Sequence, residues 1–89
     1  MRTKRFVMGL DNSRKIRVIC NGVGFYTTVK GAFDMCIHEQ RVAVTSALSS
    51  LGVRQTLPED QRPTGFGTRV QCFNSKGEQV GVDVQVDLC

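Results

Sequence analysis

The stretch from Lys15 to Lys30, KIRVICNGVGFYTTVK, decides much of the fold because it carries the strongest hairpin signal in the chain. Two runs of residues that favour strands flank the dipeptide Asn21-Gly22. Both central residues of a type I′ turn need a positive φ angle, and asparagine and glycine tolerate that angle best. A two-residue turn also fixes which residues pair, so we expect Cys20 to lie opposite Val23.

The two faces of this hairpin differ in chemistry, because successive side chains of a strand point to opposite sides. One face is apolar: Ile16, Val18, Cys20, Val23, Phe25 and Val29. The other face is basic and carries one aromatic ring: Lys15, Arg17, Ile19, Tyr26, Thr28 and Lys30. We expect the first face to pack on a core and the second to face solvent.

The segment before the hairpin reads as a further strand over Phe6–Leu10, followed by turn chemistry at Asp11–Ser13. If Leu10 pairs with Arg14, the apolar residues of this strand and of the hairpin share one face, whereas a slip of one residue scatters them. The sequence therefore predicts a three-stranded meander. This register would bring Arg5 onto the basic face.

A helical period replaces the strand period between Ala32 and Leu51. The apolar stripe consists of Phe33, Ile37, Val44, Leu48 and Leu51. Gly52 follows at once and is typical of the residue after a helix end, so we expect the helix to stop there. A short strand over Val53–Leu57 and a loop over residues 58–65, which contains two prolines, should come next.

The last third of the chain reads as a second hairpin. Its final strand alternates without a break, with Val80, Val82, Val84, Val86 and Leu88 on one side. The parity of the preceding run favours a three-residue turn over residues 75–77, with Gly77 in the left-handed conformation. This turn pairs Cys72 with Val80 and places Arg69 opposite Asp83.

These elements predict a single domain of residues 1–89 in the α+β class. Its antiparallel sheet should have about five strands, in the order βββα(β)ββ, with one helix packed across one face. The sequence leaves open how the strands of the two halves are ordered in the sheet.

Composition gives weaker constraints. The chain has 89 residues and a formal net charge of +4, so it can hold one modest core and mildly favours an anionic partner. Its basic first residues lack the apolar segment of a secretory signal, and no apolar run approaches the roughly 20 residues that span a bilayer. Four cysteines without a C-x-x-C pair are then expected to be reduced thiols, and the cytoplasm is the expected location.

No motif indicates catalysis, a metal or a cofactor. Cys36 and His38 are two residues apart on the predicted helix, so they point about 200° apart and are poorly placed to share a metal. His38 is expected at the surface without the burial that tunes a general base. We therefore expect a protein that is not an enzyme and needs no cofactor, and a minimal enzyme ranks third among the hypotheses.

The basic face of the meander is the first candidate for function. Cations around an aromatic ring on an open sheet suit nucleic acid, because the cations meet phosphates and the ring stacks on a base. The alternative is a solvated face with an incidental tyrosine. The candidate residues for binding nucleic acid, or a protein that handles nucleic acid, are Arg5, Lys15, Arg17, Tyr26 and Lys30.

The runner-up is a stoichiometric protein inhibitor or adaptor of the mobile-element type, such as a phage anti-defence or anti-CRISPR-like protein that docks on a host protein. Met35 and Val42 lie opposite the apolar stripe of the predicted helix. Two exposed apolar residues would form a small patch, which is a candidate interface for a homodimer or a protein partner.

Overall fold

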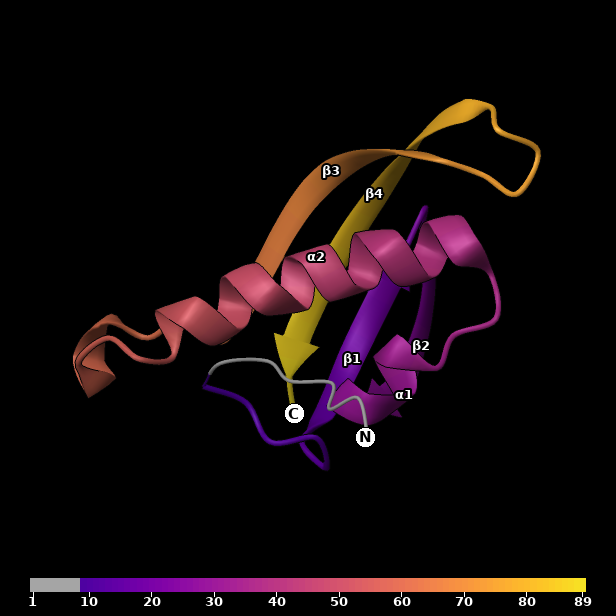
Figure 1. The fold of residues 1–89 in the computed structure, drawn as a ribbon. Helices are drawn as coiled ribbons and strands as arrows, with labels where there is room; N and C mark the ends of the chain where they lie inside the picture. Colours follow the sequence, from indigo (N-terminus) through magenta and orange to yellow (C-terminus); the bar gives the residue numbers. More distant parts are fainter. Residues whose placement is uncertain (1–8) are drawn as a thin grey trace, which may run out of the picture.

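A four-stranded antiparallel sheet with one main helix across it forms the part of the chain that the computed structural model describes, residues 9–89 (Figure 1). The predicted α+β class is confirmed. In chain order the elements are β1 (Lys15–Cys20), β2 (Val23–Thr28), α1 (Val29–Phe33), α2 (His38–Arg54), the 3-10 helix η1 (Glu59–Gln61), β3 (Gly65–Phe73) and β4 (Gln79–Leu88).

The first hairpin, β1–β2, has the predicted turn and register. Asn21 and Gly22 have φ angles of 49° and 85°, so both adopt the left-handed conformation that a type I′ turn requires. Cys20 pairs with Val23, and the pairing runs in step to the other end of the strands.

The second hairpin, β3–β4, is also confirmed. Gly77 has a φ of 81°, and Cys72 pairs with Val80. The turn is held by Asn74, whose side-chain oxygen accepts hydrogen bonds from the backbone N–H groups of Lys76 and Glu78 at 2.9 and 3.0 Å. Local turn chemistry therefore fixes both hairpins.

The order of the strands, β2-β1-β4-β3, shows that the predicted meander is wrong. The edge of β1 that faces away from β2 pairs with β4. The predicted meander had placed Phe6–Leu10 at this edge. Residues 6–8 of that predicted strand lie outside the described residues. The turn at Asp11–Ser13 is present, since the Arg14 N–H donates to the Asp11 carbonyl at 3.0 Å. β4, the strand with the longest apolar alternation in the chain, thus lies inside the sheet and pairs with a strand on each side.

The predicted single helix over residues 32–51 is two helices instead. Thr28 begins α1, because its hydroxyl oxygen accepts a hydrogen bond from the Gly31 N–H at 3.1 Å. Residues 34–37 then connect α1 to α2. The guanidinium of Arg41 donates to the Met35 carbonyl at 2.9 Å and so ties this connection to the first turn of α2.

The predicted helix end at Gly52 and the short strand at Val53–Leu57 are both wrong. α2 continues to Arg54, and the next residues form turns rather than a strand. Gly52 is buried, and a Cβ on Gly9 would overlap its carbonyl oxygen. The absence of a side chain at Gly9 therefore allows two backbone segments to approach closely here.

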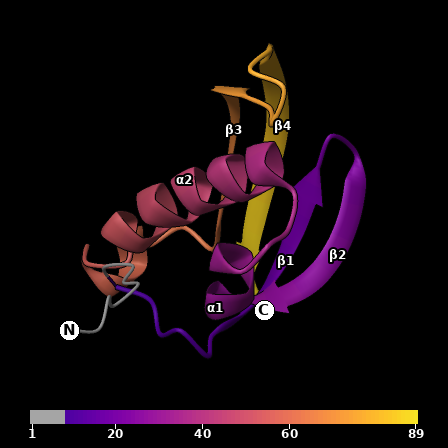
Figure 2. The ribbon, with the colours of Figure 1, turned by 45° about the vertical axis from the view of Figure 1, so that its right-hand side comes forward.

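The core lies between the sheet and α2. Figure 2 shows α1 and α2 on the same side of the sheet, and α2 crosses β3 and β4. Its buried residues are Ala43, Val44, Ala47, Leu48, Leu51 and Gly52, which meet the fully or nearly fully buried Ile16, Val18, Val82, Val84 and Val86 of the sheet. The small residues on α2 let the helix sit close to the strands. No helix within residues 9–89 is long and apolar enough to cross a membrane.

Candidate binding surface

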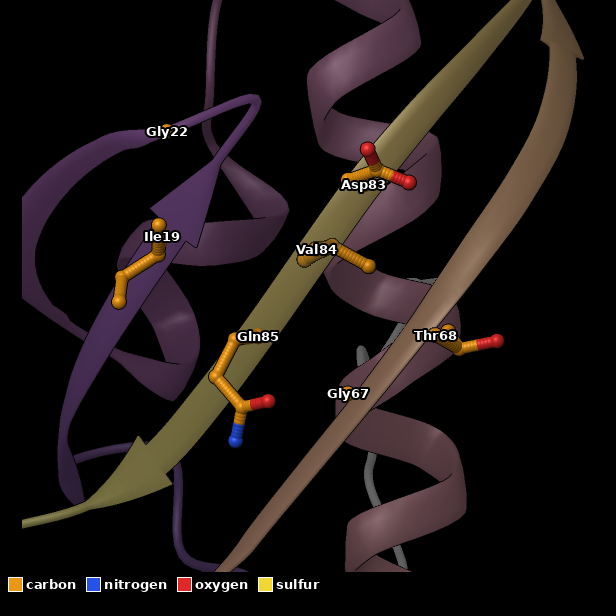
Figure 3. A pocket seen from close by; sticks show the side chains of 7 residues that line it. All are labelled: Ile19, Gly22, Gly67, Thr68, Asp83, Val84 and Gln85. Carbon is orange, nitrogen blue, oxygen red and sulfur yellow. The ribbon is translucent and has the colours of Figure 1, made fainter.

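The side of the sheet away from the helices carries the candidate surface, and we call it the outer face. Figure 3 views this face, with α2 behind the strands. The register assigns to it Lys15, Arg17, Ile19, Gly24, Tyr26, Thr28, Gly65, Gly67, Arg69, Gln71, Phe73, Gln79, Gly81, Asp83, Gln85 and Asp87. Both α1 and α2 lie on the opposite side of the sheet and leave this face uncovered by them.

Three of the five predicted nucleic-acid residues lie together at one corner of the outer face. Tyr26 on β2 is 75 % exposed and pairs directly with Arg17 on β1. Lys15 lies two residues along β1 from Arg17 and pairs with Thr28. Tyr26 is part of the lining of an open hollow of about 500 Å³, together with Lys15, Ile16, Thr27, Thr28 and Cys89. We call Lys15, Arg17 and Tyr26 the basic corner.

The other two predicted residues are not part of this corner. Lys30 lies in α1 rather than at the end of a strand, and its ammonium group pairs with the Asp34 carboxylate at 2.8 Å. The prediction that Lys30 lies on the outward face of a strand is therefore wrong, because β2 ends at Thr28 and α1 begins at Val29. Arg5 lies outside the residues that the structure describes.

Acidic residues of β4 partly neutralise the outer face. Arg17 donates a hydrogen bond to Asp87 at 3.0 Å, and this bond together with the charge of Asp87 raises the pKa of the Arg17 guanidinium. Arg69 pairs with Asp83 at 3.1 Å, as the sequence predicted. Lys15 differs from these two arginines, because the structure gives its positive charge no acidic partner within residues 9–89.

A second hollow, of about 400 Å³, lies near the middle of the outer face. Ile19 and Gly67 are part of its lining, together with Gly22, Thr68, Asp83, Val84 and Gln85 (Figure 3). The side chain of Gln85 lies over Gly67 and donates to Asp87 at 3.0 Å. Asp87 in turn lies over Gly65. Polar side chains of β4 thus occupy the space beside glycines of β3.

The predicted apolar patch of Met35 and Val42 is wrong in its placement. Both side chains are partly buried and pack against the core. Met35 belongs to the connection between the two helices, and the end of α1 changes the direction of the chain before α2 begins. The two residues therefore do not form an exposed face of one helix.

The residues considered for catalysis or metal binding are His38 and the four cysteines. His38 is exposed at the start of α2, and its ring nitrogen Nδ1 lies 3.1 Å from the guanidinium of Arg41. Within residues 9–89 no three His, Cys, Asp or Glu side chains gather in a way that could hold a metal ion. All four cysteines are free thiols, with Cys20 and Cys72 buried and the other two exposed.

Sequence reasoning missed the part that β4 plays on this face. The partner of Arg17 is Asp87, yet these residues are brought together only by the pairing of β1 with β4. The single available signal was that the acidic residues of the last strand alternate with its valines, so they had to face away from the core.

Charge along the sequence is also uneven. The first eight residues contain three of the 12 lysines and arginines and no acidic residue, which leaves nine basic and eight acidic side chains in residues 9–89. The described domain is therefore close to neutral.

No protein-family model, curated protein or solved structure matches this chain.

Proposed function

We propose that this protein is a non-catalytic binding protein that holds single-stranded nucleic acid at the basic corner of its sheet. The observation that carries the proposal is the pairing of an exposed aromatic residue, Tyr26, with Arg17, next to Lys15, on the face opposite α1 and α2. Aromatic rings on open sheets bind single strands because every base has a flat face that can stack.

The parts of the corner take different roles. Tyr26 offers its ring to a base, and the adjoining hollow gives room for the neighbouring nucleotide. Lys15 supplies the charge for a phosphate. Arg17 is oriented by its hydrogen bond to Asp87. A second phosphate that binds Arg17 would therefore share its guanidinium with this carboxylate. The corner is thus suited to weak binding with little sequence preference.

Titration of labelled oligonucleotides, followed by fluorescence anisotropy, tests the stacking role. Tyr26→Ala should weaken binding to single strands by about 1–3 kcal/mol, whereas Tyr26→Phe should keep most of it. Phe73→Ala is the matched control, because Phe73 is a 59 % exposed aromatic residue on the same face but on the other edge strand. Equal losses from Tyr26→Ala and Phe73→Ala would rule out the corner as the site.

The salt dependence of the same titration tests the charged contacts. Two phosphate contacts, from Lys15 and Arg17, predict a log–log salt slope of about −1.4 for single strands. Lys15→Gln should flatten this slope by about 0.7. Lys76→Gln removes the same charge at the tip of the second hairpin and should leave the slope unchanged. A complete lack of binding at low salt would defeat the proposal.

The second candidate function is docking on a protein as an inhibitor or adaptor, and one observation favours it. The arginines of the outer face are paired with acidic residues of the same face, so the surface is almost neutral and hydrogen-bonded within itself. Such a surface suits a polar protein partner better than a phosphate backbone. A pull-down from the native host with and without nuclease separates the two functions, since only a protein partner survives the nuclease.

A further inference from the structure

The outer edge of β2 lacks the features that keep sheet edges from pairing with other strands. Edge strands are usually protected by charged residues, prolines or bulges. β2 reads Val23-Gly24-Phe25-Tyr26-Thr27-Thr28, which contains no charge and no proline, and its pairing with β1 has no bulge. Within residues 9–89 no strand pairs with its other edge.

The turn decides which backbone groups of β2 point outward. The pair that closes a two-residue hairpin turn exchanges both hydrogen bonds, so Val23, Phe25 and Thr27 direct their N–H and C=O groups to β1. The hydrogen bond from the Val29 N–H to the Arg14 carbonyl, at 3.0 Å, continues this alternation. The outward donors and acceptors therefore belong to Gly24, Tyr26 and Thr28, of which Thr28 also caps α1.

We propose that a second copy of this chain pairs with this edge, so that two β2 strands run antiparallel about a twofold axis at Phe25. In this register Gly24 of each copy lies opposite Tyr26 of the other, so outward-pointing residues of the two strands meet. Two such pairs give four main-chain hydrogen bonds. The two sheets become one continuous sheet of eight strands.

The side chains of β2 match this register on both faces. On the outer face each Tyr26 ring, now 75 % exposed, would lie across Gly24 of the second copy, an arrangement known to support glycines in strands. Gly24 has open space beside it, since a Cβ there would meet only Ile19 Cγ1 at 3.7 Å and the Val18 carbonyl at 3.8 Å. On the inner face the two Phe25 rings would meet at the axis, and Val23, 66 % exposed, would face Thr27.

Other pairings of the edges fit less well. An axis at Tyr26 would set the two tyrosines opposite each other and leave Gly24 opposite Thr28, whose carbonyl and hydroxyl serve the first turn of α1. On the other edge of the sheet, β3 carries Arg69 in its middle, a charge of the kind that protects edges. The β2 pairing goes beyond the proposed function and does not depend on it, but it uses the same Tyr26 ring and would place two basic corners on one face.

Sedimentation at several concentrations tests the edge as the interface. The wild type should show a concentration-dependent equilibrium between monomer and dimer. Gly24→Pro removes the outward N–H of β2 and spares every bond to β1, so it should shift the protein to monomer and weaken association at least tenfold. Gly24→Ala keeps the N–H and should still form dimers. A wild type that stays monomeric, or dimers that survive Gly24→Pro, would overturn the proposal.

Disulfide cross-linking tests the register and does not depend on the proline variant. Gly24→Cys and Tyr26→Cys are made separately in a chain that also carries Cys36→Ser and Cys89→Ser, which removes the exposed thiols. The mixture of the two variants should form the mixed disulfide, which mass spectrometry distinguishes from self-linked species. Self-linking of Tyr26→Cys alone, or no cross-link above the level of a Lys76→Cys control, would overturn the register.

Discussion

The inner and outer faces of the same sheet are held by different kinds of interaction. On β4 the inward residues Val82, Val84 and Val86 are buried under α2, while Asp83, Gln85 and Asp87 between them face outward. The inner face is organised by close packing against a helix with small residues. The outer face is organised by hydrogen bonds and ion pairs that lie over glycines.

This difference separates what folding requires from what is left for function. Burial of the inner face supplies most of the driving force, because apolar area removed from water dominates the stability of a small domain. The exposed pairs of the outer face contribute little, since ion pairs in water are typically worth about 0–1 kcal/mol. Binding chemistry on the outer face can therefore change with little loss of stability.

The largest expected effect comes from a charge placed on the inner face. Val86→Asp buries a carboxylate at a fully buried position and should cost about 4 kcal/mol or more, enough to unfold a marginally stable domain. Gln79→Asp adds the same group to the outer face of the same strand and should change the free energy of unfolding by less than about 0.5 kcal/mol. Urea denaturation measures both. Similar costs would show that the two faces do not differ as described.

The next effect tests the close fit of α2. Ala47 is fully buried, and Ala47→Leu should destabilise the domain by about 1–3 kcal/mol because the core has no room for the added methylenes. Ser46→Leu adds a leucine at the neighbouring exposed position and should be nearly neutral. If Ala47→Leu stabilised the protein instead, the helix would not be as close to the sheet as its small residues imply.

The sequence predicted the features that neighbouring residues decide. Asn21-Gly22 and Gly77 each impose a turn, and each turn fixes the register of its own hairpin without reference to the rest of the chain. The division into an apolar and a polar face follows from the same alternation. For this reason the pairing of Arg17 with Tyr26, the basis of the candidate site, was predictable.

Features set by contacts between distant segments were not predictable. The pairing of β1 with β4 depends on which strand offers the best apolar edge, and a run from Phe6 to Leu10 satisfied the same local pattern. Gly52 matched a helix end by its position, but it lies inside α2, and its carbonyl oxygen is where Gly9 makes a close approach. The partner of Arg17 on β4 follows from the same long-range pairing.

A third effect separates the buried from the exposed thiols. Burial raises the pKa of the Cys20 thiol above its ordinary value of 9.0, and its interaction with Cys72 adds to the shift. Above that ordinary value the unfolded chain loses a proton that the folded chain keeps, so stability should fall as the pH rises from 9 toward the folded-state pKa. Cys20→Ala should make this fall shallower, measured as the difference in unfolding free energy between pH 7 and pH 10. Cys89→Ala, at an exposed position, should leave the fall unchanged.

The smallest effect concerns two glycines of the outer face. Gly24→Ala should stabilise the monomer by about 0.4–1 kcal/mol, because alanine restricts the unfolded chain and its Cβ meets only ordinary contacts. Gly67→Ala should gain nothing, since the side chain of Gln85 occupies the space and would have to move, together with its hydrogen bond to Asp87. Thermal unfolding at low protein concentration, where association does not contribute, measures both variants. No positive φ and no close contact within residues 9–89 explains why position 24 lacks a side chain. A loss of stability in Gly24→Ala would show that β2 is more tightly constrained than these contacts indicate. It would also count against the proposal that a second copy fills this space.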